Sequence, residues 1–224
     1  MIKTVIITGA SRGIGFALSQ QFLSSGYKVI GTSRTGEVSN LTHPNFEALK
    51  LDLSDEKTIN VFVKLFEQKN IEIDILINNA GVGPDLDNLN PEKESFQLTF
   101  DVNITGTVFL TELLCQYIKV GGKIINISSV MGSIGLCERI DSVAYRMSKA
   151  ALNMYTKILS NRLFNKQDIA SVHPGWVRTT IAEDNIVNGR LSPKESAIKI
   201  FDFVTSNFET GTFWDIEAES KTEW

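Results

Sequence analysis

The chain has 224 residues, of which 42% are hydrophobic and 21% are charged, and its 22 Lys and Arg against 26 Asp and Glu give a net charge of −4. This length suits one domain with a single core spanning residues 1–224. The charge balance lacks the basic excess of nucleic-acid-binding proteins, and no apolar run approaches the roughly 20 residues of a membrane span.

Short apolar, β-branched runs alternate with helical patterns along the whole chain. Strands are expected at residues 4–8, 28–32, 46–51, 73–77, 123–128, 168–173 and 212–214. Helices are expected at residues 14–24, 54–68, 96–117, 144–163 and 192–206, while residues 35–44 are too mixed in composition to assign. Continuous apolar strands favour a parallel sheet that is covered on both faces. The alternation predicts an α/β fold, a doubly wound, Rossmann-like parallel sheet of about seven strands with helices on both faces.

The N-terminal residues read as a strand and lack the longer apolar region and cleavage site of a signal peptide. Cys115 and Cys137 form neither a disulfide framework nor a metal-binding spacing. We therefore expect a cytoplasmic protein without a metal site.

A glycine-rich turn joins the first strand to the first helix, with the sequence Thr8-Gly9-Ala10-Ser11-Arg12-Gly13-Ile14-Gly15. Glycines let the backbone approach a ligand closely, and the helix N-terminus offers free N–H groups and a positive dipole to a pyrophosphate. The spacing is G-x-x-x-G-x-G rather than the commoner G-x-G-x-x-G, and such a turn can also be purely structural. Its place at the first strand, opening the first helix, favours dinucleotide binding.

Tyr145 and Lys149 lie four residues apart in a stretch without Gly or Pro. On a helix they share one face, and a nearby cation favours phenolate over phenol. The pair could supply a proton donor or acceptor near neutral pH, although the same spacing is ordinary on a solvated helix face.

Seven features in chain order resemble the short-chain dehydrogenase/reductase family in its compact single-domain form. They are the loop 8–15, Leu51-Asp52-Leu53, Asn78-Asn79-Ala80-Gly81, the mid-helix Asn103, Ser128-Ser129, Tyr145-x-x-x-Lys149, and Pro174-Gly175-Trp176-Val177-Arg178-Thr179. The match covers essentially the whole chain. Within the family, the C-terminal end and the helix that carries Tyr145 are similar to the small reductases grouped with C-factor and sniffer-type carbonyl reductases.

The resemblance implies four catalytic residues. Tyr145 would exchange a proton with the carbonyl or alcohol oxygen, and Lys149 would hold the cofactor ribose and lower the pKa of Tyr145. Ser129 would hydrogen-bond the same substrate oxygen, with Ser128 as the rival for this role. Asn103 would bind a water that links Lys149 to solvent, or would form a hydrogen bond at a helix bend.

The resemblance also implies cofactor contacts at the ends of the strands. The residues concerned are Gly9, Ser11, Arg12, Gly13, Ile14, Gly15, Asp52, Leu53, Asn79, Ala80, Gly81, Tyr145, Lys149, Pro174, Gly175, Val177 and Thr179. Asp52 could instead be an acid at a helix N-terminus, and Thr179 a simple loop residue. Asn78 is expected to tie strands together, and His173 to serve packing.

The end of the second strand indicates NADP(H) rather than NAD(H). NAD-preferring folds place an acid there for the ribose 2′-hydroxyl, but this chain reads Ser33-Arg34 and has no acid before Glu37. Ser33 can donate a hydrogen bond to a 2′-phosphate, Arg34 can pair with it, and Arg12 can approach it from the loop. Each arginine alone could be a solvated surface residue.

We therefore expect an NADP(H)-dependent oxidoreductase that interconverts a carbonyl and an alcohol on a small, rather apolar substrate. The pocket candidates are Met131, Trp176, Ile181 and Trp214. A dinucleotide-binding signalling or regulatory protein is the alternative. A nucleotide-sugar epimerase or dehydratase needs a larger C-terminal domain than the roughly 50 residues after Pro174 can build.

The segment that precedes Tyr145 is longer than in the family, with the extra length in residues 136–141, and the segment after Thr179 is short. The helices 103–117 and 145–163 carry surplus apolar residues, named as Phe109, Leu113, Leu152, Tyr155 and Ile158. Relatives associate through these two helices, so a homodimer or homotetramer is expected.

Overall fold

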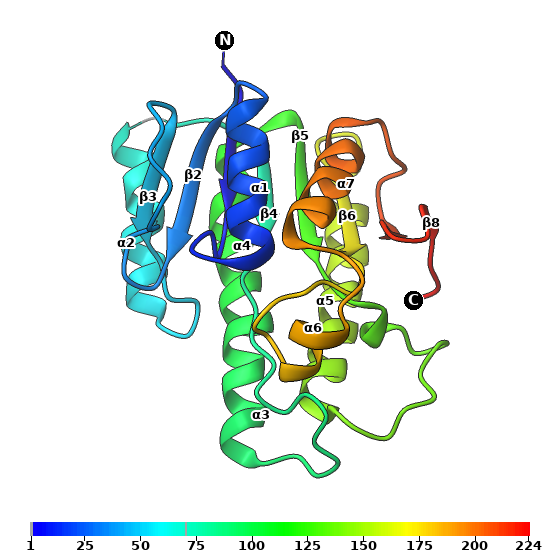
Figure 1. The fold of residues 1–224 in the computed structure, drawn as a ribbon. Coiled ribbons are helices and arrows are strands. Elements are labelled where there is room, and N and C mark those ends of the chain that lie inside the picture. Colours follow the sequence, from blue (N-terminus) through cyan, green and yellow to red (C-terminus); the bar gives the residue numbers. More distant parts are fainter. Residues whose placement is uncertain (1, 70) are drawn as a thin grey trace.

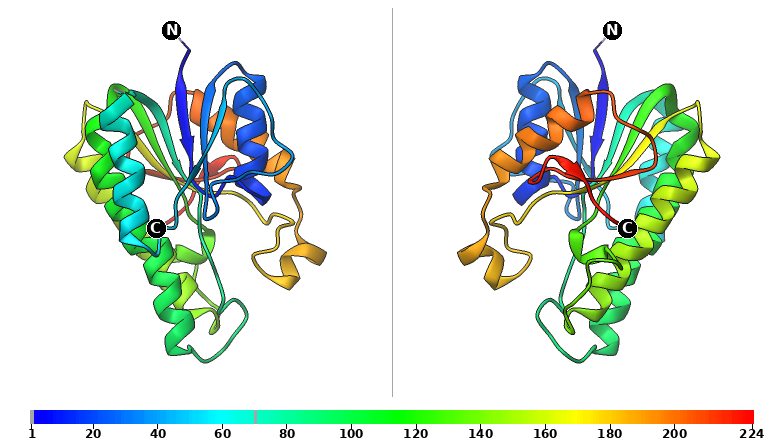
Figure 2. Two further views of the ribbon diagram at one scale, coloured as in Figure 1. Left: turned by 90° about the vertical axis from the view of Figure 1, so that its left-hand side faces the viewer. Right: turned by 90° about the vertical axis from the view of Figure 1, so that its right-hand side faces the viewer.

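The computed structural model describes residues 2–69 and 71–224, and its strands form one eight-stranded sheet with helices on both faces (Figures 1 and 2). The strand order is β3-β2-β1-β4-β5-β6-β7-β8. The bounds are β1 (Thr4–Ile7), β2 (Lys28–Ser33), β3 (Phe46–Lys50), β4 (Ile73–Asn78), β5 (Ile118–Ile127), β6 (Asp168–His173), β7 (Thr212–Asp215) and β8 (Ser220–Lys221). Strands β1 to β7 pair in parallel and β8 pairs antiparallel with β7. The predicted α/β architecture is confirmed, and β8 is an addition to it.

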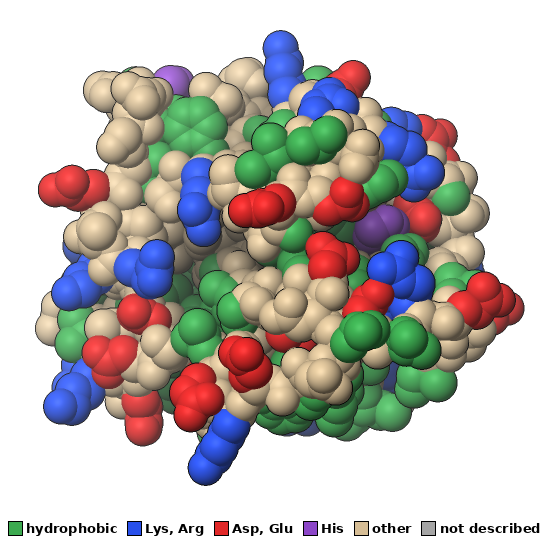
Figure 3. Space-filling view, turned by 60° about the horizontal axis from the view of Figure 1, so that its bottom comes forward, with side chains coloured by type: hydrophobic (Ala, Val, Ile, Leu, Met, Phe, Trp, Pro, Cys, Tyr) green, Lys and Arg blue, Asp and Glu red, His purple; other side chains and the backbone are tan. Residues whose placement is uncertain are grey.

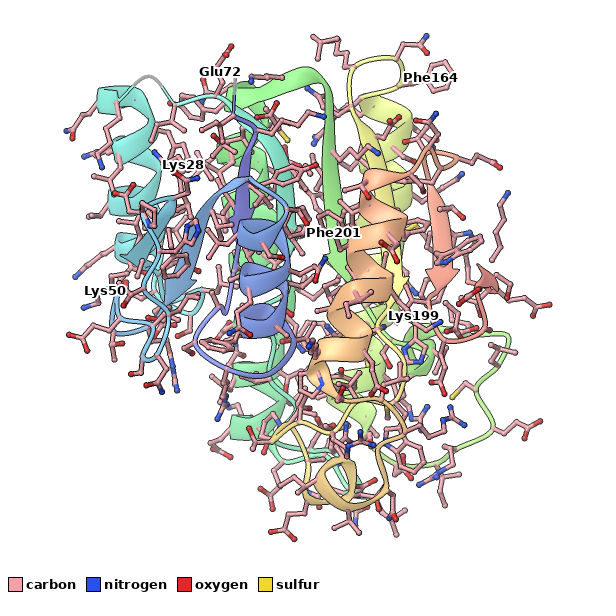
Figure 4. The ribbon with its side chains drawn as sticks, turned by 45° about the horizontal axis from the view of Figure 1, so that its top comes forward. Lys28, Lys50, Glu72, Phe164, Lys199 and Phe201 are labelled. Atoms are coloured by element: carbon pink, nitrogen blue, oxygen red, sulfur yellow. The ribbon has the colours of Figure 1, made fainter. Side chains whose placement is uncertain are left out.

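Two groups of helices cover the sheet, one on each face (Figure 2). One face carries α1 (Gly13–Ser24) and α7 (Pro193–Thr205), and the other carries α2 (Glu56–Lys69), α4 (Thr107–Leu114) and α5 (Val143–Arg162). On the first face, Phe201 lies on the side of α7 toward α1 (Figure 4), and its ring meets that of Phe22 edge-on at 4.9 Å. Each face therefore has its own apolar core, as two-sided cover requires.

The helix expected at residues 96–117 begins earlier, at Lys93, and is divided into four segments in the structure. These are α3 (Lys93–Phe100), the π-helical η1 (Asp101–Gly106), α4, and the 3-10 turn η2 (Cys115–Tyr117). The π-helical segment packs closely on the chain after β3. A Cβ on Gly106 would lie 1.9 Å from the Leu53 carbonyl oxygen, so a side chain has no room at this position. Such π-helical turns inside helices are frequent at functional sites.

Two further differences concern the start of β5 and a short helix. The strand β5 begins at Ile118 rather than at 123, because Ile118 pairs with Ile73 across a register shift in β4. The six-residue helix α6 (Glu183–Asn188) was not expected, since it is too short to carry an apolar period. Residues 35–44, which the sequence left unassigned, contain turns, bends and irregular backbone.

The helical run Lys93–Tyr117 is long and apolar enough to cross a membrane by length and composition alone, with a mean hydropathy of 1.2 in its most apolar window. A helix that covers a sheet passes the same test. Leu110 and Leu114 of this run lie fully buried in the core between α4 and the sheet. The α4 part of the run therefore covers one sheet face.

Strands β2 and β3 are added to one side of β1 and those from β4 onward to its other side, so the strand order reverses between the parallel neighbours β1 and β4. Their carboxyl ends are joined by Thr8, whose hydroxyl oxygen accepts hydrogen bonds from the N–H groups of Asn79 and Ala80, both at 3.0 Å. In doubly wound sheets, ligands bind in the crevice at this switch point. A ligand-binding site is therefore expected at the carboxyl ends of β1 and β4.

Candidate active site

The glycine loop after β1 forms a close-packed cradle. Gly9 has a φ of +69°, and a Cβ on Gly15 would lie 2.3 Å from the Gly9 carbonyl oxygen. Asn79 Nδ2 donates to the Thr8 carbonyl at 2.7 Å, which holds the loop against the end of β4. The N-cap residue of α1, Arg12, is extended and makes no side-chain cap. The helix N-terminus therefore keeps its donors and its positive dipole for a ligand.

The end of β2 lies beside this loop, because the Ala10 N–H donates to the carbonyl of Thr32, the second-last residue of β2, at 2.8 Å. Arg12 and Arg34 are both exposed. Ser33 is buried, and its hydroxyl donates to the Glu37 carbonyl at 2.8 Å. The two arginines are thus free to meet a phosphate, whereas the hydroxyl proton of Ser33 is already used in the turn.

The side chains of Asp52 and Asn78 each form hydrogen bonds within the protein. Asp52 Oδ1 accepts from both the N–H (3.0 Å) and the hydroxyl (2.7 Å) of Ser54, the turn that leads into α2. Asn78 Nδ2 donates to Thr111 Oγ1 at 2.9 Å and to Asn126 Oδ1 at 2.8 Å. Asn78 therefore ties β4 to α4 and β5, as the sequence indicated.

Asn103 lies in η1 and clamps the loop that follows β4. Its Oδ1 accepts from the Val82 N–H, and its Nδ2 donates to the Val82 carbonyl, both at 2.9 Å. The same Nδ2 donates to Ser148 Oγ on α5 at 3.1 Å. The Asn103 side chain thus joins three elements around Gly81 and Lys149, and its hydrogen bonds run to the loop and to α5 rather than along its own helix.

The two serines after β5 differ in their hydrogen bonds. Ser128 Oγ donates to Asn153 Oδ1 on α5 at 2.7 Å, so its proton is used within the protein. Ser129 Oγ accepts from the Met131 N–H at 3.1 Å, which leaves its own proton to donate. Ser129 therefore has the hydrogen-bonding capacity that a substrate oxygen requires.

Tyr145 and Lys149 are both buried on α5. Lys149 Nζ lies 5.5 Å from the centre of the Tyr145 ring and donates to the Ile127 carbonyl at 2.9 Å. Burial, and after it the charge of Asp85, raise the pKa of Tyr145 to about 12, while burial lowers the pKa of Lys149 to about 8. The expected lowering of the Tyr145 pKa is wrong for this structure, because loss of solvation and the charge of Asp85 both favour the neutral phenol.

A cavity of about 350 Å³ opens at this edge of the sheet, and Figure 3 shows the face that contains it, with hydrophobic side chains in and around a hollow. The expected residues that line it are Ile14, Asn79, Gly81, Ser129, Met131, Tyr145, Lys149, Pro174, Gly175, Trp176, Val177, Thr179 and Ile181. Trp214 was wrongly expected to line the pocket. Its ring stacks on that of Phe203, with 5.4 Å between the ring centres. The sequence reasoning missed Leu86, Asn185 and Arg190, which come from loops and from α6 and carry no local pattern.

His173 also lines the cavity, although the sequence indicated packing alone. It is buried at the end of β6, and its Nδ1 has no hydrogen-bond partner among residues 2–69 and 71–224. Burial lowers its pKa, so the ring is largely neutral near pH 7. In the same part of the chain, no group of three His, Cys, Asp or Glu side chains is arranged to hold a metal ion.

A glycine cradle at the switch point and a cavity that contains Ser129, Tyr145 and Lys149 define a dinucleotide-dependent oxidoreductase of Rossmann-like fold. The short chain dehydrogenase family model matches residues 3–188, and the chain belongs to that family of oxidoreductases.

Two solved structures and one sequence relative locate the chain within the family. The carbonyl reductase Sniffer of Drosophila melanogaster superposes with a TM-score of 0.89 at 25% identity, covering all of both chains. The NADPH-bound carbonyl reductase from chicken fatty liver superposes with a TM-score of 0.87 at 26% identity, covering 100% of this chain and 94% of that one. Farnesol dehydrogenase of Aedes aegypti is 32% identical over 209 residues, covering 87% of this chain and 85% of the relative. The resemblance to sniffer-type carbonyl reductases is thus confirmed.

Replacement of Lys149 by Met tests the cost of burying this ammonium group. Because the pKa of Lys149 is lowered from 10.5 to about 8, the folded state is penalised below pH 8, by up to about 3 kcal/mol. The penalty fades as the pH rises to 10.5, since the unfolded chain then also loses its proton. In urea unfolding from pH 7 to 10, the stability of the Lys149→Met variant relative to wild type should be highest at pH 7 and should fall as the pH rises. Lys157→Met, an exposed control on the same helix, should show no such trend. A stability difference between Lys149→Met and wild type that does not change with pH would contradict the lowered pKa of Lys149.

Proposed function

We propose that the chain is an NADP(H)-dependent oxidoreductase that interconverts a carbonyl and an alcohol on a small, rather apolar substrate. The observation that carries the proposal is that Ser129, Tyr145 and Lys149 line one cavity beside the glycine loop. The carbonyl reductases among its structural relatives, one of them bound to NADPH, support the same reaction class.

The residues present fit a dinucleotide. The loop 9–15 and the N-terminus of α1 suit a pyrophosphate, because Gly9 and Gly15 let the loop turn tightly where a Cβ would clash with the protein itself, and no side chain caps the helix. Asn79, Gly81, Pro174, Gly175, Val177 and Thr179 line the adjoining cavity and would hold the nicotinamide half. When bound, the nicotinamide supplies or accepts the hydride.

Tyr145 supplies the proton in the reducing direction. With its pKa raised to about 12, the phenol is protonated at neutral pH and can donate to a carbonyl oxygen. Ser129 can donate a second hydrogen bond to the same oxygen as negative charge develops there. Lys149 uses one N–H on Ile127 and has two left to stabilise the phenolate that forms and to bind ribose hydroxyls.

The rest of the cavity favours an apolar substrate. Its walls beyond the reacting groups include Leu86, Met131, Trp176 and Ile181. Arg190 also lines it, but this cation is paired with Glu217 at 2.6 Å. An apolar carbonyl compound therefore suits the walls better than an anionic one.

We also propose that the protein forms a homodimer or homotetramer through α4 and α5. Phe109 on α4 is 60% exposed, and Met154 and Ile158 on α5 are 62% and 53% exposed. Exposed apolar side chains on neighbouring helices are typical of an interface. Leu152, however, was wrongly counted among the surplus residues, since it is buried.

Loss of the Tyr145 hydroxyl tests the proton donor. Tyr145→Phe should lower turnover at least ~100-fold, as expected for the loss of a positioned acid, while NADPH affinity by fluorescence titration hardly changes. Ser129→Ala should also lower turnover, whereas Ser128→Ala should mainly lower the melting temperature, because its proton bonds to Asn153. Near-wild-type turnover by Tyr145→Phe would exclude Tyr145 as the donor. Wild-type protein that binds NADPH and turns over no carbonyl in a broad apolar panel would instead favour a regulatory role.

The exposed arginines predict the choice of dinucleotide. Charge-assisted contacts of about 1.5–3 kcal/mol each should give NADPH at least a tenfold advantage over NADH in kcat/KM. Arg12→Ala and Arg34→Ala should each reduce this ratio, and Ser33→Asp combined with Arg34→Ala should invert it without abolishing activity. Lys57→Ala, an exposed cation on α2, is the control. Equal use of NADPH and NADH by wild type would show that Arg12 and Arg34 do not recognise the ribose 2′-phosphate.

Light scattering at micromolar concentration tests the assembly. Wild type should have the mass of a dimer or a tetramer, and Phe109→Asp combined with Ile158→Asp should give monomers because two charges are placed in the apolar contact. Ile198→Asp, at an exposed position on α7 on the opposite face of the sheet, should leave the mass unchanged. A monomeric wild type would remove the proposal.

A further inference from the structure

Asp85, in the loop between β4 and α3, lies against the first turn of α5. It is 1% exposed, and its Oδ2 accepts hydrogen bonds from the Ala144 N–H at 2.7 Å and from the Tyr145 N–H at 3.3 Å. The N-cap residue of α5, Ser142, has a left-handed backbone with a φ of 59° and makes no side-chain cap. The helix that carries Tyr145 is therefore capped by a carboxylate from another element.

The same loop is fixed to α5 by further contacts. The Asp87 N–H donates to Ser142 Oγ at 3.0 Å, and the Ser142 N–H donates to the Asn88 carbonyl at 2.9 Å. A Cβ on Gly83 would lie 3.0 Å from Cδ2 of Tyr145, so the loop backbone also packs on the phenol ring. The backbone and the ring of Tyr145 thus both rest on residues 83–88.

Asp85 also brings a negative charge close to Tyr145. Its Oδ1 is buried without a hydrogen-bond partner within the described residues, so part of this charge is not compensated by local donors. After burial, the charge of Asp85 is the second cause that raises the pKa of Tyr145. An anion in a buried site opposes the formation of a second anion beside it.

Other ionisable groups face Tyr145 from the neighbouring elements. Lys149 lies one turn along α5, and His173 and Arg190 line the same cavity. Arg190 pairs with Glu217, and burial lowers the pKa of His173.

Two more charges lie at the start of α5, where Arg146 and Asp141 pair with each other at 3.1 Å. Among the carboxylates of these elements, Asp85 is the one that hydrogen-bonds the backbone of Tyr145 itself.

We propose that Asp85 is a positioning residue, which anchors Tyr145 at the cavity and keeps its hydroxyl protonated for donation to a carbonyl. This inference rests on the proposed function, in which Tyr145 is the proton donor. It adds that the chain suits carbonyl reduction up to alkaline pH, since the proton needed at the start of that reaction is held in place by a neighbouring carboxylate.

The first test uses NMR of protein labelled with ¹³C at tyrosine Cζ, and it needs neither substrate nor turnover. The Tyr145 resonance is assigned by its loss in Tyr145→Phe. Asp85→Asn keeps an acceptor for the two N–H groups but removes the charge, so its Tyr145 titration midpoint should fall by about one pH unit, a tenfold change in acidity. Asp85→Ser, which also keeps an acceptor, should give the same shift.

The matched control is Asp87→Asn. Asp87 is an exposed acid in the same loop and contacts α5 through its backbone N–H, so this variant should leave the Tyr145 midpoint unchanged. Equal midpoints in Asp85→Asn, Asp87→Asn and wild type would overturn the electrostatic part of the proposal whether or not the protein proves to be a reductase.

The second test measures carbonyl reduction. In Asp85→Asn the alkaline limb of the pH profile should move to lower pH by the same amount as the NMR midpoint. Asp85→Ala also removes the helix cap, and its kcat should fall at least tenfold while its NADPH affinity stays within about twofold of wild type. Unchanged kcat in Asp85→Ala would overturn the anchoring role, and a parallel loss of NADPH affinity would show a general structural role instead.

Discussion

The site depends on one buried hydrogen bond, from Lys149 Nζ to the carbonyl of Ile127 at 2.9 Å. Lys149 is 4% exposed, so a cationic donor is held in a medium where hydrogen bonds to charged groups are strong. The bond joins the middle of α5 to the last residue of β5. Because Ser129 follows two residues later and Tyr145 stands one helical turn before Lys149, the same bond sets the distance between the serine and the tyrosine.

The surroundings of this bond leave little freedom for α5 to move. A Cβ on Gly132 would lie 2.6 Å from the Lys149 carbonyl carbon, so the turn after Ser129 packs directly on the helix backbone. Beneath it, a chain of buried hydrogen bonds crosses the sheet from α4 to β6, and its members are Thr111, Asn78, Asn126, Thr156 and Ser171. Asn78 Oδ1 has no partner within the described residues, but each member is hydrogen-bonded to the next, and buried networks of this kind favour one arrangement of the elements they join. Asp85 adds the cap at the N-terminus of α5, and the proton donor is thereby held from both ends.

The sequence was most informative where a function depends on residues that are close in the chain. The glycine loop, the pair Tyr145 and Lys149, and the order of strands and helices are local patterns, and the structure has the expected elements in that order. The choice between Ser128 and Ser129 needed the fold, because only the packing of Asn153 shows which hydroxyl has its proton committed.

Features that depend on distant neighbours could not be read from the sequence. Asp85 stands in an irregular loop, and its contact with Tyr145 spans 60 residues of sequence. Trp214 and Leu152 were misassigned because burial by other elements, not residue type, decides which apolar side chains face a pocket or solvent. The direction of the Tyr145 pKa shift was also wrong, since the sequence shows the nearby cation but not the degree of burial.

The most direct test of the account follows a deuterium label. Protein would be incubated with NADPH deuterated on either face of nicotinamide C4 and with a panel of apolar aldehydes and ketones, and the products would be analysed by mass spectrometry. If the protein is an NADPH-dependent carbonyl reductase, the product is an alcohol with one deuterium on the former carbonyl carbon, formed with one of the two labelled cofactors and not with the other. Consumption of NADPH without a labelled alcohol, or no alcohol from any member of the panel, would contradict the account.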